Sequence, residues 1–321
     1  MSDPTNMPTP FETVQPPESE WAARSDKPGR SVFGNYKAET TLAGPVPAPH
    51  QTGPDPAASS AGSLPGSAMD AALARSFIHR FLALCFEDPT EERWTKMANC
   101  DCREVLQPAI HTLAIPTLTE AARTFQAQLV PEAFDSFLTA CLAAFGHAAR
   151  GRCPLNEIEY GDIKADPLFQ PHRLADLAAF YRAFGLEVAG NADERHDHIC
   201  MELEFMCVLT AKEAYALGNQ LNADAISICR DAQKRFLRDH LGRWTPAFTR
   251  RLARMAAGTP LEALANLTRS FIESECALFG VTPGSEDLLL RPVDAASETM
   301  CDSCGLNQLP PGALPQSPAA V

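Results

Sequence analysis

Ionisable side chains are concentrated just before a helix-forming stretch in the second half of the chain. Five of them are consecutive and a sixth follows one helical turn later: Glu194, Arg195, His196, Asp197, His198 and Glu202. Carboxylates of this kind can pair with guanidinium groups, and imidazoles titrate near neutral pH. A second possibility is a local structural role. We expect Asp197 to be the N-cap or an early first-turn residue of the helix that follows.

The element that must position these groups is the stretch directly after them. Ile199, Leu203, Met206 and Leu209 recur at spacings of three and four, which predicts a helix with a buried face. His198 and Glu202 lie one turn apart and share another face. The pattern indicates a polar site mounted on a core helix, with simple capping as the alternative.

Metal binding is another chemistry that these residue types allow. His196 and His198, with Glu194 and Glu202, could in principle hold a metal. The four residues lie so close in sequence that capping and hydrogen bonding fit them better. We therefore expect no metal and no cofactor here.

Cysteines provide a weaker metal or redox signal near the C-terminus. Cys301 and Cys304 form a Cys-x-x-Cys pair, and no second pair has this spacing. Cys100 and Cys102 could complete a four-cysteine zinc site only if the fold brought the two pairs together. We expect tail cysteines without metal, and keep Cys301 and Cys304 as the candidate ligands if metal is bound.

Enzyme motifs are missing from the sequence. It contains no G-x-x-x-x-G-K-[ST], no G-x-G-x-x-G after a strand, no H-E-x-x-H and no G-x-S-x-G. It also contains no Glu-x-x-His, which a di-iron helical bundle would need twice. We therefore expect a binding protein and not an enzyme.

Composition restricts the partners. A net charge of −13 and a pI near 5.1 argue against nucleic-acid binding and favour a cationic partner. No secretory signal is visible in residues 1–15, and no apolar run reaches the ~18 residues of a membrane span. We expect a cytoplasmic protein without membrane insertion. Its 11 cysteines then fit a reducing compartment. The cysteines expected to be buried thiols inside helices are Cys85, Cys141, Cys207, Cys229 and Cys276.

The chain divides by composition into three parts. Residues 1–66 are rich in Pro, Ala, Gly, Ser and Thr, and we expect them to be disordered. Within them, residues 21–42 are less biased and could form a docking motif, although an inert tail is the simpler reading. Residues 67–284 predict an all-α domain of about ten helices, and residues 285–321 a flexible tail. The helices expected besides the one after Asp197 are 71–86, 91–98, 103–113, 118–129, 133–149, 173–186, 222–241, 244–255 and 261–279.

Three motifs in order carry a resemblance to a known family. They are LADLAAFYRAFGLEV (174–188), ERHDHICMELEFMCVL (194–209) and FLRDHLGRWTPAF (236–248). Together they resemble the TorD/DmsD-type, NarJ-like chaperones of molybdoenzyme maturation. The resemblance covers residues 67–280 and is strongest from Glu157 onward. It implies an all-helical cytoplasmic chaperone that binds the twin-arginine signal peptide of a molybdenum-cofactor oxidoreductase. Such a chaperone would hold the apoenzyme back from export until the cofactor is inserted.

The resemblance also implies a peptide-binding site. The family signature is an acidic residue followed by Pro-Asp-His, which Glu194, Asp197 and His198 match. His196 stands in place of the proline, which puts the rigidity of the first turn in doubt. Glu194 and Asp197 would pair with arginine, and His198 would tune that contact near neutral pH. The remaining site residues are Glu202, Tyr160, Tyr181 and Phe184.

The aromatic residues would receive the apolar part of the peptide in a groove, with the alternative that they are core. The implied partners are the catalytic subunit of the oxidoreductase and its signal peptide, bound by a monomer or homodimer. Two other functions stay open at this point. One is a guanine-nucleotide-binding switch, as reported for some members of the family. The other is a metal or iron–sulfur handling protein that uses Cys301 and Cys304.

Overall fold

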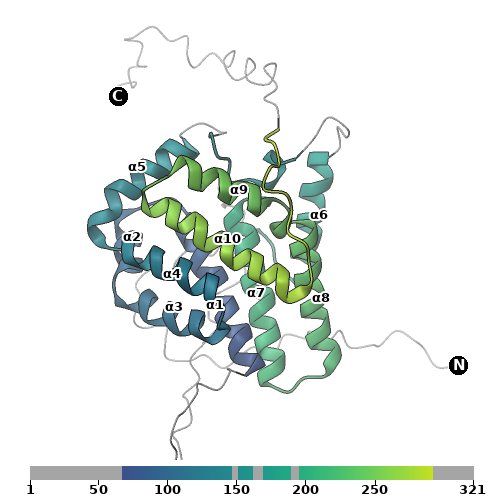
Figure 1. Ribbon diagram of the computed structural model, residues 1–321. Helices are drawn as coiled ribbons and strands as arrows, with labels where there is room; N and C mark the ends of the chain where they lie inside the picture. The colour runs from purple at the N-terminus through teal and green to yellow at the C-terminus, as the bar shows by residue number, and fades with distance from the viewer. Residues whose placement is uncertain (1–66, 147–150, 162–168, 189–194, 292–321) are drawn as a thin grey trace, which may run out of the picture.

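The computed structural model describes residues 67–146, 151–161, 169–188 and 195–291, and in this part of the chain the predicted all-α fold is confirmed (Figure 1). This part of the chain contains ten α-helices, and two of the connections between them contain a 3-10 turn. The helices are α1 (Ala68–Phe86), α2 (Glu91–Ala98), α3 (Cys100–Leu113), α4 (Pro116–Gln128), α5 (Phe134–Phe145), α6 (Phe169–Ala183), α7 (Ile199–Gly218), α8 (Ala223–Asp239), α9 (Leu241–Met255) and α10 (Pro260–Phe279). The 3-10 turns are η2 (Pro131–Ala133) and η3 (Glu157–Glu159).

Helices α1 and α7 form the antiparallel pair at the centre of the domain. Near its middle, Ser76 Oγ donates to the Cys207 carbonyl at 3.0 Å. Toward one end, Cys200 Sγ donates to the Ala83 carbonyl at 3.3 Å. Helix α8 packs against α7, while α10 packs against α9 and α4 (Figure 1). The start of α7 and the end of α1 therefore lie together, and the site is built around them.

Several helix ends follow from local sequence and lie within two residues of the predicted ranges 222–241 and 261–279. Asn222 caps α8 by accepting from the Ala225 N–H at 2.9 Å. Pro260 opens α10, and Gly280 ends it in the left-handed region with φ 61°. Each of these signals acts within one turn of the chain, so the sequence alone is sufficient to place them.

Other helix bounds differ from expectation. The N-cap of α7 is His198, so the expectation that Asp197 caps this helix or lies in its first turn is wrong. Helix α5 ends at Phe145, short of the predicted 149, because Gly146 leaves the helix with φ 72°. Helix α9 begins at Leu241 and not at Trp244, since only His240 separates it from α8. The apolar period alone does not place these three ends.

A charged cluster is buried where α1, α7, α8 and α10 meet. Arg75 donates to both oxygens of Glu275 at 2.7 Å, and to Glu213 at 3.0 Å. His79 Nε2 lies 3.1 Å from Glu275 Oε2. Burial acts to raise the pKa of Glu275, but Arg75 and His79 outweigh it and lower that pKa to about 2. Arg230 of α8 also donates to Glu213, at 2.6 Å, so that the cluster joins all four helices.

Further expectations concern the cysteines, the two tails, the domain boundary and membrane insertion. The cysteines expected to lie inside helices are free thiols, all buried apart from the partly exposed Cys207. Residues 1–66, Cys301 and Cys304 lie outside the described residues, as do the side chains of Cys100 and Cys102. Contacts of the domain run past the boundary expected at 284, because the Arg291 N–H donates to the Glu159 carbonyl at 2.9 Å. No helix of the described residues is long and apolar enough to cross a membrane.

Candidate functional site

The segment 151–161 lies against the start of α7 and forms one side of the candidate site. The Ile199 N–H donates to the Leu155 carbonyl at 2.9 Å, and the Glu157 N–H donates to the Asp197 carbonyl at 2.9 Å. Between them, Asn156 and His198 form an antiparallel bridge. These backbone bonds fix the segment to the residues that the sequence singled out.

Asp197 is the buried link between this segment and α7. Its Oδ1 accepts from Asn156 Nδ2 at 3.2 Å, and its Oδ2 accepts from the Ile158 N–H at 3.2 Å. The half-exposed guanidinium of Arg195 adds two parallel hydrogen bonds, at 3.0 and 2.9 Å. The pairing with arginine that we predicted for Asp197 is therefore made here by a residue of the same chain.

His198 is the N-cap of α7 and faces the 151–161 segment. Its Nδ1 accepts from the Cys200 N–H at 3.3 Å, a role that only the neutral ring can fill. Burial lowers the pKa of His198 to about 4; Asp197 acts against this shift and Arg195 acts with it. The expectation that His198 titrates near neutral pH is therefore wrong.

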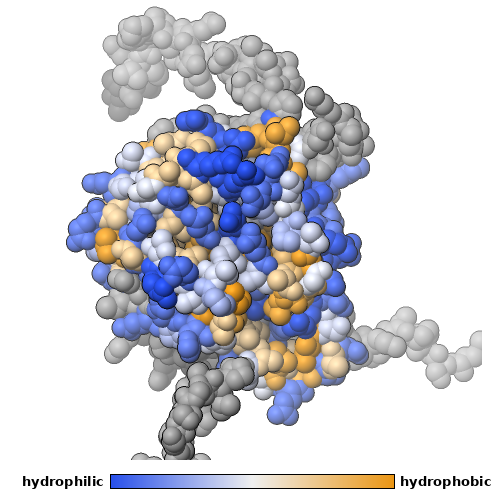
Figure 2. All heavy atoms as spheres, in the orientation of Figure 1, coloured by the Kyte–Doolittle hydropathy of each residue, from blue (hydrophilic) through white to orange (hydrophobic). Residues whose placement is uncertain are grey.

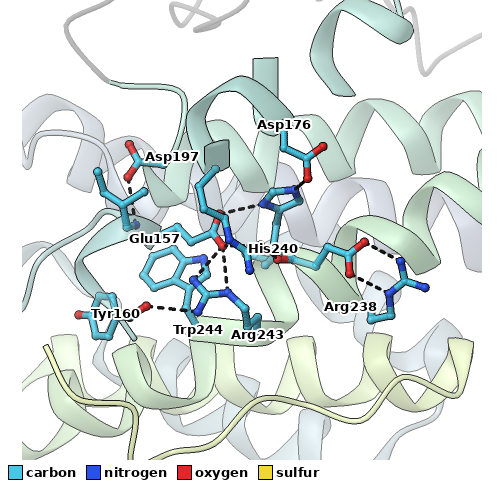
Figure 3. A network of polar contacts seen from close by, with 12 residues as sticks. Glu157, Tyr160, Asp176, Asp197, Arg238, His240, Arg243 and Trp244 are labelled. Atoms are coloured by element: carbon cyan, nitrogen blue, oxygen red, sulfur yellow. Dashed lines mark hydrogen bonds and ion pairs between the residues drawn. The ribbon is translucent and has the colours of Figure 1, made fainter. Parts of the chain in front are cut away.

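Glu157 is the centre of a second buried network, which the sequence did not reveal (Figure 3). One oxygen accepts from Arg243 at 3.1 and 2.9 Å, and the other lies 2.9 Å from His240 Nδ1. On its other side, His240 Nε2 lies 3.2 Å from Asp176. Burial acts to raise the pKa of Glu157, but His240, Arg243 and Arg173 outweigh it and the pKa is lowered. The ionised carboxylate thus ties the 151–161 segment to α6 and α9.

Glu202 belongs to the first turn of α7, and its side chain is fully buried. Trp244 Nε1 donates to its Oε2 at 3.1 Å, and its Oε1 is buried without a hydrogen-bond partner. Burial, together with the nearby charges of Glu157 and Asp197, raises the pKa of Glu202 well above its usual value. Burial in the core therefore favours the protonated form of this side chain.

The predicted aromatic residues are mostly part of the core. Tyr160 is fully buried and donates to the Pro154 carbonyl at 2.8 Å. Tyr181 is also buried and donates to the His196 carbonyl at 2.7 Å. Phe184 is partly buried and packs on Phe205, with ring centroids 5.8 Å apart. Both tyrosines are therefore core residues, as the alternative interpretation stated. Direct contact of Tyr160, Tyr181 or Phe184 with a peptide stays a prediction.

Residues 289–291, at the C-terminal end of the described domain, pair with the same segment. The Gly161 N–H donates to the Leu289 carbonyl at 3.0 Å, and Tyr160 and Leu290 form an antiparallel bridge. Arg291 also bonds the Glu159 side chain, at 3.3 Å. Both sides of the 151–161 segment are thus paired with backbone from distant parts of the chain.

A cavity of about 300 Å³ opens beside this segment. Its walls come from the end of α1 and the turn after it, from α5, from the 151–161 segment and from His198. Apolar and thiol side chains form much of its surface: Cys85, Phe86, Pro89, Cys141, Leu142, Phe145, Cys153, Pro154 and Leu155. Burial raises the pKa of both Cys141 and Cys153 to about 12, so these thiols stay protonated at neutral pH.

The charged side chains that line the cavity are acidic. They are Glu87, Asp88 and Glu159, and among the described residues no lysine or arginine lines it. Glu87 is paired with Arg93 at 2.9 Å and Glu159 with Arg291, both from outside the cavity. A cavity with an apolar wall and carboxylates around it suits a ligand that is part cationic and part apolar.

The residues singled out from the sequence lie together around the start of α7, with one exception. Glu194 lies outside the described residues, so its part in the site stays a prediction. Of these predicted residues, only His198 lines the cavity. Asp197 does not line it but accepts a hydrogen bond from the Ile158 N–H of the 151–161 segment. The residues missed were Glu157, His240 and Arg243. Their only signal was the presence of charges inside otherwise apolar motifs.

The described residues show no cluster of three or more His, Cys, Asp or Glu that could hold a metal ion. This region includes His196, His198 and Glu202, while Glu194, Cys301 and Cys304 lie outside it.

Known proteins similar to this chain are assembly chaperones. The model of the nitrate reductase delta subunit family matches residues 113–250. The perchlorate reductase assembly chaperone of Dechloromonas aromatica (strain RCB) is 28% identical over 212 residues, which is 64% of this chain and 90% of that protein. The dimethyl sulfide dehydrogenase assembly chaperone of Rhodovulum sulfidophilum is 29% identical over 258 residues, 75% of this chain and 95% of that protein.

A shorter match joins the chain to TorD itself. The chaperone protein TorD of Vibrio cholerae serotype O1 (strain M66-2) is 28% identical over 120 residues, 37% of this chain and 52% of that protein. No solved structure matches the chain significantly. The relatives are named as chaperones and not as enzymes, in agreement with the prediction from the motifs. The chain is similar to the TorD-type, nitrate reductase delta subunit-like family of molybdoenzyme assembly chaperones.

Proposed function

We propose that this protein assists the maturation of a molybdenum-cofactor oxidoreductase by binding the signal peptide or apo form of its catalytic subunit before export. The observation that carries the proposal is the cavity beside His198, which combines an apolar wall with acidic side chains. A twin-arginine signal peptide has the matching order of chemistry, a basic pair followed by an apolar segment. The similarity to assembly chaperones for perchlorate reductase and dimethyl sulfide dehydrogenase supports the class of client.

The buried networks behind the cavity hold its wall in place for this binding. Asp197 and Glu157 each fix the 151–161 segment from behind, and the 288–291 residues fix it from the other side. A preformed wall lowers the ordering cost when a flexible peptide binds. On this proposal, Asp197, Glu157, Tyr160 and Glu202 position the wall, while Leu142, Asp88 and His198 are placed to contact the peptide. No covalent step is involved, because the function is binding and release.

The proposal is tested with a fluorescent synthetic peptide that carries an arginine pair followed by an apolar segment. Its anisotropy is measured against the full chain. A second peptide with lysines in place of the arginine pair serves as a control, since lysine cannot make bidentate contacts to a carboxylate. We expect the arginine peptide to bind more tightly.

The matched protein variants are Leu142→Gln in the cavity and Val105→Gln on α3. Both residues are exposed to a similar degree, at 41% and 48%. Leu142→Gln is expected to weaken peptide binding, and Val105→Gln to leave it unchanged. Equal affinity of both variants and the wild type would place the peptide elsewhere. Client identity is tested separately, by co-purification with the tagged chain from its native host.

A further inference from the structure

Exposed apolar side chains gather at the end of the domain farthest from the cavity, over the turn that joins α7 to α8 (Figure 2). Tyr215 on α7 is 59% exposed, Leu221 in the turn 42%, and Ile228 on α8 41%. We call these three residues the hairpin patch. Large apolar residues that are grouped on a surface mark sites where another segment binds, whereas single ones need no explanation.

Acidic residues accompany the patch on α8. Asp224, Ile228 and Asp231 are exposed and follow one another at spacings of four and three, so they lie on one face of the helix. Asp231 accepts from Ser227 Oγ at 3.1 Å, which orients its carboxylate along this face. An occupant of the hairpin patch should therefore combine apolar or aromatic side chains with positive charge.

The chain enters the described domain at the same place. Helix α1 begins beside the end of α7, where a β-carbon on Gly218 would lie 2.8 Å from Met69 Sδ. Ser67, the N-cap residue of α1, therefore lies near the hairpin patch. The cavity lies at the other end of the α1–α7 pair, roughly 30 Å away for helices of this length.

The preceding part of the chain contains a segment with the required chemistry. Residues 21–42 hold three aromatic residues, Trp21, Phe33 and Tyr36, together with four basic and two acidic residues. The net charge of the segment is thus positive in a chain whose net charge is −13. Residues 43–66, only 24 in number, join it to α1. A random-coil chain of this length would span roughly 25–30 Å, which is enough to reach the patch.

We propose that residues 21–42 dock on the hairpin patch of their own chain. Trp21, Phe33 or Tyr36 cover Tyr215, Leu221 and Ile228, while the basic residues of the segment face Asp224 and Asp231. The short linker keeps the segment at a high effective concentration beside the patch, so that modest contacts are sufficient. The segment leaves the cavity open for the client and shields an apolar surface of the chaperone from other chains.

Tryptophan fluorescence of the full chain tests this directly. The sequence has three tryptophans, and two of them, Trp94 and Trp244, are buried in the described domain. Acrylamide quenching therefore reports mainly on Trp21, and a Trp21→Phe variant supplies the background of the other two. We expect Trp21 to be shielded, with a quenching constant severalfold below that of a free peptide of residues 21–42.

The double variant Tyr215→Gln, Ile228→Gln is expected to raise the quenching constant to the value of the free peptide. Val105→Gln and Leu142→Gln, which remove exposed apolar residues elsewhere, should leave it low. Trp21 quenched as readily in the wild type as in the peptide would overturn the proposal. Loss of shielding in Leu142→Gln alone would place the segment in the cavity. Shielding that increases with protein concentration would assign it to a second copy, and either result overturns docking within one chain.

Discussion

Arg195 binds Asp197 through two parallel hydrogen bonds, Nε to Oδ1 at 3.0 Å and Nη2 to Oδ2 at 2.9 Å. Asp197 is fully buried, whereas the Arg195 side chain is 48% exposed. The guanidinium thus occupies one acceptor position on each oxygen of this buried carboxylate. An incoming signal peptide that uses Asp197 must first displace Arg195.

This competition leads to the first prediction. If Asp197 receives a client arginine, Arg195→Ala should strengthen binding of the arginine peptide. A half-exposed ion pair is worth about 1 kcal/mol or less, so the expected change in Kd is up to about fivefold. Fluorescence anisotropy measures it, with the lysine peptide as control. Unchanged or weaker binding in the variant would show that Asp197 only holds the 151–161 segment.

Glu157→Gln is predicted to destabilise the domain strongly. The variant removes a fully buried carboxylate that pairs with Arg243 and Arg173, whose side chains are 19% and 23% exposed. Breaking a buried ion pair on one side costs about 3–5 kcal/mol. Urea unfolding followed by circular dichroism measures the free energy of unfolding. The control is Glu92→Gln, whose carboxylate is 79% exposed beside Lys96 and should change stability by about 0.5 kcal/mol or less. Equal stability of the two variants would contradict the anchoring role of Glu157.

Glu202→Gln is predicted to stabilise the protein, and more so as the pH rises. Because its pKa is raised on folding, the folded state holds a proton that the unfolded state loses above about pH 4.3. Wild-type stability therefore falls with rising pH from that point, and glutamine removes this loss while still accepting from Trp244. Urea midpoints at acidic, neutral and alkaline pH measure the difference. A difference between variant and wild type that does not change with pH would mean that Glu202 is ionised in the folded protein.

His198→Asn is predicted to flatten the acid side of the stability profile. The pKa of His198 is lowered to about 4 on folding, so the stability it contributes is present above about pH 6.5 and is lost as the pH falls toward 4. The loss in the wild type should be about 2–3 kcal/mol over this range. Asparagine keeps a capping acceptor for the Cys200 N–H and does not titrate. Parallel pH profiles of the two proteins would contradict this assignment.

The sequence alone determined the features that depend on neighbouring residues. Asn222, Pro260 and Gly280 place helix ends through contacts within one turn, and the apolar period places the buried face of α7. The three motifs around α6, α7 and α9 also pointed to the chaperone family, which the similar proteins confirm. The helix ends and the buried face depend only on residues that are close in sequence, so they can be predicted without knowing the tertiary fold.

Only the tertiary structure decided which charged residues meet. Glu157 is bonded to Arg243, 86 positions away, and its neighbour Ile158 is bonded to Asp197, 39 positions away. It also decided that Tyr160 is core, that His198 is neutral and that Leu142 shares a cavity with Asp88. Burying a charged side chain costs desolvation free energy. Here that cost is offset by hydrogen-bond and ion-pair partners that the fold brings from other elements. No periodicity within one segment carries that information.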